Sequence, residues 1–180
     1  FQEEDYDQSQ EVLFSIVDST SSDRVVFSKY ESLCSIARVT DDFVSYREYL
    51  NVFKTAAYGT KRPFVALNVH NYLVDYFVKT EQPDSAQYYA MKLEDNLTQV
   101  DTTQFLDYVY FSYNVLADHY VKSNGPKSYR YKNYANAINE QIVLKQKEVL
   151  IDMIDLNESF SELKKENSSL NTDLQFFKKN

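Results

Sequence analysis

One motif occurs twice in this chain: residues 71–88 read NYLVDYFVKTEQPDSAQY, and residues 114–131 read NVLADHYVKSNGPKSYRY. The two segments align without a gap, and eight of their eighteen positions are identical, including Leu73/Leu116 and Pro83/Pro126. Each segment has the pattern of a helix, a short turn that contains proline, and a second helix. The motif therefore predicts a unit of two antiparallel helices that is repeated along the chain.

A fainter third copy lies upstream, with the pairs Leu33/Leu73, Thr40/Thr80, Ser45/Ser85 and Tyr49/Tyr89. One helix pair cannot bury its own apolar face, so repeated pairs must stack on one another. The repeats therefore predict a helix-turn-helix solenoid, which we expect to occupy residues 1–141.

The composition of the whole chain favours helices. Only 2 glycines and 3 prolines occur in 180 residues, too few for the tight turns of a sheet protein. Apolar periodicity predicts helices at residues 6–18, 22–38, 42–57, 63–79, 84–98, 102–122 and 127–177. Asp41 is expected to cap the third helix, and Gly59 and Gly125 are expected as left-handed residues between helices. The predicted fold class is all-α.

A second pattern begins at Ile142, where apolar residues recur every seven positions. After Leu156 the apolar stripe is narrow, which is typical of a coiled coil, so residues 142–180 are predicted to form one long helix with a coiled coil from about residue 157. The wider stripe before it predicts packing on the repeats. An amphipathic helix folding back on its own chain is the alternative. The residues expected to pair two helices are Leu156, Phe160, Leu163, Asn167, Leu170, Leu174 and Phe177.

The sequence contains no pattern that predicts a catalytic, cofactor or metal site, so we expect a protein that is not an enzyme. His70 and His119 are the only histidines and lie far apart, and no zinc-protease, paired-cysteine or serine-hydrolase motif occurs. Cys34 is the only cysteine. Its apolar neighbours indicate a buried thiol rather than a reactive one.

The repeated motif resembles the tetratricopeptide repeat in a lengthened form, over about residues 24–140. Leu73, Phe77 and Ala86 match the family's apolar, aromatic and small positions, and Leu116 matches in the second copy. In that copy Tyr129 stands where the family has alanine. The repeat spacing also exceeds the family's length of about 34 residues. The resemblance implies a superhelix of helix pairs, with a concave face built from the first helix of each pair.

Polar residues form a repeated stripe on these first helices: Asn71, Asp75, Lys79, Asn114, Asp118 and Lys122. Spacing by four places each set of three on one helix face, which the sequence predicts to lie opposite the core residues Leu73, Val74 and Phe77. The resemblance implies that these positions line a peptide-binding groove. The alternative is that the charges are solvated side chains that only support the helix.

The formal net charge of −8 disfavours binding to nucleic acid by this segment. Repeats that run into a coiled coil resemble the extracytoplasmic part of Bacteroidetes-type membrane-bound sensor kinases and transcriptional regulators. That resemblance implies a protein or peptide partner, a homodimer formed through the last helix, and a periplasmic location, with a cytoplasmic one as the alternative. Any membrane contact would come from segments outside this chain. The alternative function is a structural scaffold or adaptor that the coiled coil oligomerises.

Overall fold

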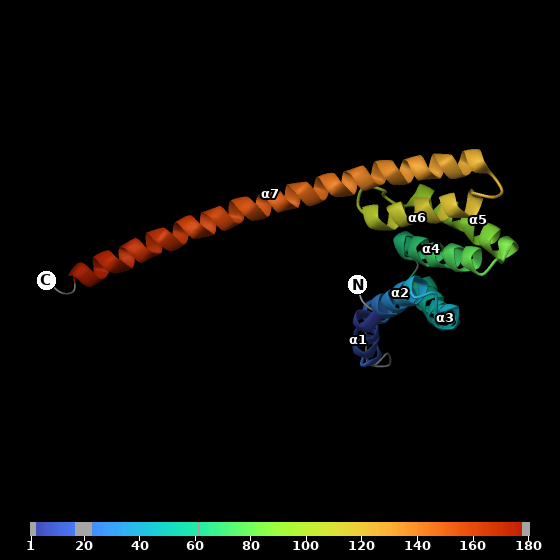
Figure 1. The fold of residues 1–180 in the computed structure, drawn as a ribbon, viewed down its shortest axis with the longest axis horizontal. Coiled ribbons are helices and arrows are strands. Elements are labelled where there is room, and N and C mark those ends of the chain that lie inside the picture. The colour runs from blue at the N-terminus through green and yellow to red at the C-terminus, as the bar shows by residue number, and fades with distance from the viewer. Residues whose placement is uncertain (1–2, 17–22, 61, 178–180) are drawn as a thin grey trace. The chain divides into compact units, whose positions relative to one another are not determined.

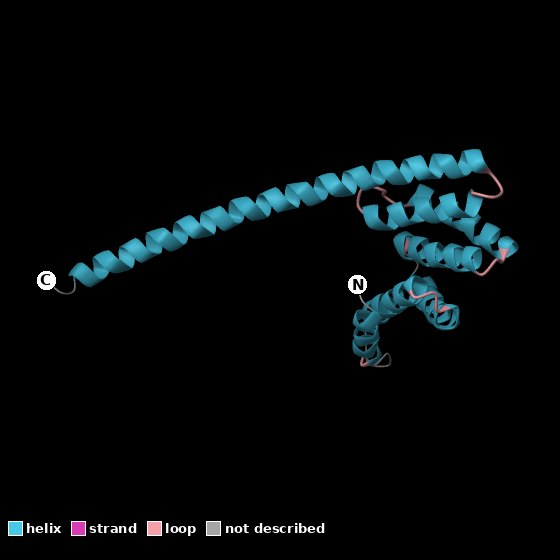
Figure 2. Cartoon of the chain, viewed as in Figure 1, coloured by secondary structure: helices cyan, strands magenta, loops and turns pink. Residues whose placement is uncertain are grey.

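The computed structural model describes residues 3–16, 23–60 and 62–177, and within these ranges the chain forms seven helices and no strand (Figure 2). The helices are α1 (Glu3–Phe14), α2 (Asp23–Val39), α3 (Phe43–Thr60), α4 (Pro63–Lys79), α5 (Pro83–Gln99), α6 (Leu106–Tyr120) and α7 (Gly125–Phe177) (Figure 1). The predicted all-α fold class is confirmed. The chain divides into two compact units, Phe1–Ile138 and Asn139–Asn180, and the division falls within α7.

The central helix of the first unit is α4, which contacts α3, α5 and α6. Its residues from Leu67 to Val74 are all buried, so the buried positions surround the helix instead of forming one stripe. The sequence of α4 explains this burial, because a helix that is apolar on nearly all sides must be covered on all sides. Asn68, His70 and Asn71 are buried with it, so their polar atoms require partners within the fold.

Aromatic side chains fill the space between α3 and α4. Tyr46 and Tyr76 meet edge to face with ring centroids 5.4 Å apart, and Phe53 meets Tyr72 in the same way at 5.7 Å. Edge-to-face pairs place the positive edge of one ring against the negative face of another, which stabilises the pair beyond its buried area. The tyrosines of this region therefore serve as core residues.

The α2–α3 and α4–α5 connections have the same backbone geometry. Asp41 and Glu81 both adopt left-handed φ angles, of 54° and 55°. The residue after each donates its amide to the carbonyl five residues earlier, at 3.0 Å from Asp42 and 2.9 Å from Gln82. This is the Schellman arrangement, which satisfies carbonyls that the end of a helix leaves without partners. The upstream copy of the motif thus shares its turn with the copy at residues 71–88.

Gly59 and Gly125 were expected as left-handed residues between helices, and that expectation is wrong. Gly59 lies within α3 and Gly125 begins α7, and neither has a positive φ. Asp41 takes the left-handed position itself, and the cap of α3 is the next residue, Asp42, whose Oδ1 accepts the amide of Ser45 at 3.1 Å. Glycine is preferred at left-handed positions but is not required there, since aspartate also tolerates them.

The α6–α7 connection differs from the other two and shifts the register of the last helix. The amide of Asn124 bonds to the Tyr120 carbonyl at 2.8 Å, and the amide of Ser128 bonds back to the Asn124 carbonyl at 2.9 Å. The corresponding bond in α5 runs from Ala86 to Gln82, so α7 starts one residue earlier than the gapless alignment predicts. The gapless alignment pairs Tyr129 with the buried Ala86, but Tyr129 is 70 % exposed, so the two residues do not correspond in the structure.

The start of α6 also differs from its prediction. The helix begins at Leu106 and not at residue 102. The Asp101 carboxylate accepts the amide of Thr103 at 2.9 Å, which stabilises a separate turn ahead of the helix. An aspartate that caps a turn has the same sequence pattern as one that caps a helix. The start of α6 was therefore predicted four residues too early.

The second unit consists of α7 from Asn139 onward. The side chains at the wider part of the apolar stripe, such as Leu144, Leu150 and Ile154, are at least half exposed. Their packing against the repeats therefore stays a prediction. The seven-residue stripe continues beyond them with Leu156 and Leu163, which are also exposed.

Candidate functional site

The three stripe residues of α4 do not share one exposed face. Asn71 is fully buried, and its Nδ2 donates to the Tyr108 carbonyl at 3.2 Å. The expectation that it lies opposite the core is wrong, because α4 is covered on all sides. Its Oδ1 is buried and has no hydrogen-bond partner among the described residues. Asn71 therefore fixes α4 to α6 and is closed to a partner in this structure.

Asp75 and Lys79 bind other helices of the same unit. Oδ2 of Asp75 accepts the Tyr46 hydroxyl at 3.2 Å. Nζ of Lys79 donates to the Arg38 carbonyl at 2.9 Å and lies 3.1 Å from Oδ1 of Asp41. Burial raises the pKa of the Asp75 carboxyl, while the charges of Arg38 and Lys79 lower it. These contacts tie α4 to the end of α2 and to α3.

The second set of stripe residues, two in α6 and Lys122 just after its end, has different surroundings. Oδ1 of Asn114 accepts Nζ of Lys132 at 2.7 Å, which joins α6 to the start of α7. Asp118 and Lys122 are exposed. Burial nevertheless raises the pKa of Asp118, against the opposing charge of Lys132. Asp118 also raises the pKa of Asp75 through its charge, so the structure brings these two carboxyls of the stripe near each other.

Sequence reasoning missed a line of polar contacts between α2, α4 and α6. Nδ2 of Asn68 donates to Oε1 of Glu31 at 2.8 Å, and Tyr108 also bonds to this carboxyl. Burial raises the pKa of Glu31, although both hydrogen bonds lower it. The available signal was a pair of asparagines, Asn68 and Asn71, three residues apart in a mainly apolar segment of α4, because buried amides require partners.

A pocket of about 710 Å³ lies beside the α4–α5 connection and the C-terminal end of α6. Its lining includes two of the predicted stripe residues, Asp118 and Lys122. The acidic residues Glu81 and Asp84 also line it. Its apolar lining residues are Phe77, Val78, Pro83, Ala86 and Val121. The volume falls in the range of about 300–1,000 Å³ that is typical of ligand sites.

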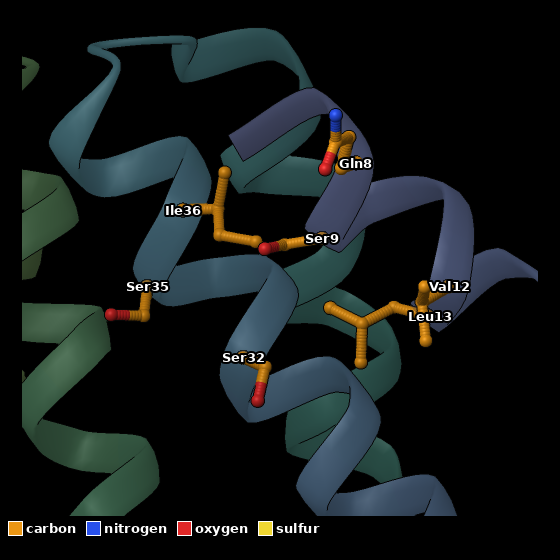
Figure 3. A pocket seen from close by; sticks show the side chains of 7 residues that line it. All are labelled: Gln8, Ser9, Val12, Leu13, Ser32, Ser35 and Ile36. Carbon is orange, nitrogen blue, oxygen red and sulfur yellow. The ribbon is translucent and has the colours of Figure 1, made fainter. Parts of the chain in front are cut away.

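A second pocket, of about 720 Å³, lies between α1 and α2 (Figure 3). Gln8, Ser9, Val12 and Leu13 line it from α1, and Ser32, Ser35 and Ile36 line it from α2. None of these seven side chains carries a charge. The pocket therefore offers hydroxyl groups and apolar surface but no electrostatic selectivity.

His70 is a buried residue of the core. It lies between Tyr58 and Asn96, with Nε2 3.0 Å from the Tyr58 hydroxyl and Nδ1 hydrogen-bonded to Asn96 Oδ1. An amide oxygen only accepts, so Nδ1 carries the proton and Nε2 accepts from the hydroxyl. Burial lowers the pKa of His70, and its ring is neutral at pH 7.

Cys34 is fully buried, which confirms the prediction of a buried thiol. Burial and the charge of Glu31 raise its pKa far above the usual range. Since the thiolate is the reactive form, Cys34 is protected from reaction by its surroundings.

The predicted pairing residues of α7 are exposed as far as their side chains are described. Leu156 is 61 % exposed, Phe160 68 % and Leu163 62 %, and Asn167 is also exposed. The side chains of Leu170, Leu174 and Phe177 lie outside the described residues.

In the described part of the chain, no group of histidine, cysteine and acidic residues is arranged to hold a metal ion. None of the helices in that part has the length and apolarity needed to cross a bilayer. No family model, curated protein or solved structure matches this chain.

Proposed function

We propose that this chain is a protein- or peptide-binding module of stacked helical repeats, which forms the sensor or interaction part of a larger signalling or transcriptional regulator. In this proposal α7 pairs with α7 of a second copy as a coiled coil. The exposed apolar stripe of α7 carries the proposal, since burying one leucine side chain contributes about 1.5–3 kcal/mol.

The repeat part of the proposal is supported by the shared turn of the first two helix pairs. Asp41 and Glu81 have nearly the same left-handed φ, and the hydrogen bonds around them correspond. Leu33, Leu73 and Leu116 are all buried at corresponding positions of the first helices. Helix pairs that agree in both turn and core are the units from which solenoids are built.

The pairing part of the proposal is supported by the spacing of the exposed residues. Leu156 and Leu163 are one heptad apart, and Phe160 lies between them at the companion position. Such a narrow stripe is covered by one partner helix. Asn167 continues the stripe at a position where a buried amide pair sets the register of a parallel dimer.

The test is the solution mass of residues 1–180, measured by light scattering at several concentrations. We expect a dimer for the chain and for the variant Ser161→Asp, which places a carboxylate outside the stripe. We expect a monomer for Leu163→Asp and for residues 1–156. A monomeric parent chain, or a Leu163→Asp variant that stays dimeric, would rule out pairing through this stripe.

A further inference from the structure

The charged residues that line the pocket beside the α4–α5 connection are mainly acidic. Glu81, Asp84 and Asp118 contribute three carboxylates, and Lys122 contributes the one ammonium group among the lining residues. Lys132 of α7 acts on Asp118 from outside the lining. His119 also lines the pocket, and burial lowers its pKa, so it is neutral at pH 7. The pocket therefore carries a negative charge and favours a cation.

Part of the pocket lining is apolar. Among the apolar lining residues, Ala86 is buried, and Phe77 and Val78 are half-buried. Val121 is 62 % exposed, which leaves a branched apolar side chain of the lining in water. An apolar group of a ligand would remove this surface from water.

The walls of the pocket are held in place before any ligand arrives. The left-handed turn at Glu81 and the ring of Pro83 set the path of the α4–α5 connection. Nε2 of His119 lies 3.0 Å from Oε1 of Gln87, which joins α6 to α5 across the pocket. A preformed site binds more tightly because little conformational entropy is lost on binding.

We propose that this pocket binds a short peptide segment in which a bulky apolar side chain neighbours a lysine or arginine. The apolar side chain packs against Phe77, Val78 and Ala86, and the cation lies against Glu81, Asp84 and Asp118. The acidic lining repels phosphate, so nucleic acid and anionic lipid surfaces do not fit this site. The choice of a peptide rests on the proposed function of the chain.

The test is selection of random octapeptides displayed on phage against residues 1–180. We expect enrichment of peptides with a large apolar residue beside lysine or arginine. One enriched peptide is then labelled, and its affinity is measured by fluorescence polarisation for the parent chain and for two variants of one exposed residue, Val121→Lys and Val121→Glu. Circular dichroism checks that both variants are folded.

The two variants differ only in the sign of the charge that they place at the pocket. Repulsion of the peptide's cation should weaken binding by at least about tenfold in Val121→Lys. Binding to Val121→Glu should equal or exceed that of the parent chain. The proposal is overturned if no peptide is enriched, if enriched peptides lack basic residues, or if both variants bind alike. Light scattering of both variants reports pairing of α7 separately, so either proposal can fail alone.

Discussion

Thr40 and Thr80 end α2 and α4 with the same two hydrogen bonds. In each residue the amide donates to the carbonyl four residues earlier, at 2.9 Å in both cases. The hydroxyl donates to that same carbonyl, at 3.1 Å from Thr40 and 2.8 Å from Thr80. Both threonines precede the left-handed residue that turns the chain into the next helix. The turn is thus specified by matched side chains although neither turn contains glycine.

This geometry predicts that Glu81→Gly stabilises the fold. The left-handed conformation destabilises a residue other than glycine by about 1–2 kcal/mol. Glycine removes this steric cost but adds an entropic cost of about 0.5–1 kcal/mol on folding. We expect the free energy of unfolding, measured by urea denaturation, to rise by up to about 1 kcal/mol. The matched variant Glu81→Ala keeps the strain and should leave stability nearly unchanged. A loss of stability in Glu81→Gly would mean that the turn is not left-handed at this position.

The core residues of α2, α4 and α6, the first helix of each pair, could be predicted from the sequence. The register of the last helix, α7, could not. Leu33, Leu73 and Leu116 are buried. An apolar residue that recurs on the same helix face in each repeat is expected to pack in the core. The identity between Tyr88 and Tyr131 was misleading, since Tyr88 is exposed and Tyr131 is buried. Sequence identity cannot report the hydrogen bond that closes α6 and moves the start of α7 by one residue.

The spacing of the polar stripe residues could be predicted from the sequence, but their exposure to solvent could not. Spacing by four placed Asn71, Asp75 and Lys79 on one face of α4. Whether that face meets water depends on α2, α3 and α6, whose positions follow from contacts distant in sequence, such as the bonds of Asn71 to Tyr108 and of Lys79 to Arg38. The pocket at the end of α6 depends on such contacts as well, so only its residues Asp118 and Lys122 were predicted.

The shifted register predicts unequal effects for two neighbouring tyrosines of α7. Tyr131 is 9 % exposed, stacks near Tyr120 and Tyr113, and donates its hydroxyl to Glu94 at 2.9 Å. We expect Tyr131→Ala to lower the free energy of unfolding by about 3–5 kcal/mol, as for other large core aromatics. Tyr129→Ala, at an exposed site, should change it by less than about 0.5 kcal/mol. Thermal or urea unfolding measures the loss of stability in each variant. Equal losses would contradict the shifted register and would support the gapless alignment of α7 instead.

The buried ring of His70 predicts a loss of stability in mild acid. Burial lowers the pKa of His70 below its usual value of 6.5, so the unfolded chain binds this proton more readily than the folded chain. Stability from His70 is therefore complete above pH 6.5 and is lost as the pH falls from 6.5 through the lower pKa of the folded state. His119 contributes with the same sign. Glu31, Asp75 and Asp118 have raised pKa values and act in the opposite direction at more acidic pH.

The measurement that isolates His70 is urea unfolding of the parent chain and of His70→Gln at pH 7.5 and pH 5.5. Glutamine keeps an amide that can bond to Tyr58 or Asn96, but it does not titrate. We expect the parent chain to lose more stability between the two pH values than the variant does, because only the parent must bind a proton on a buried ring. The carboxyl groups are common to both proteins, so their contribution cancels in the comparison. An equal pH dependence in the two proteins would show that His70 is protonated as easily in the folded chain as in water.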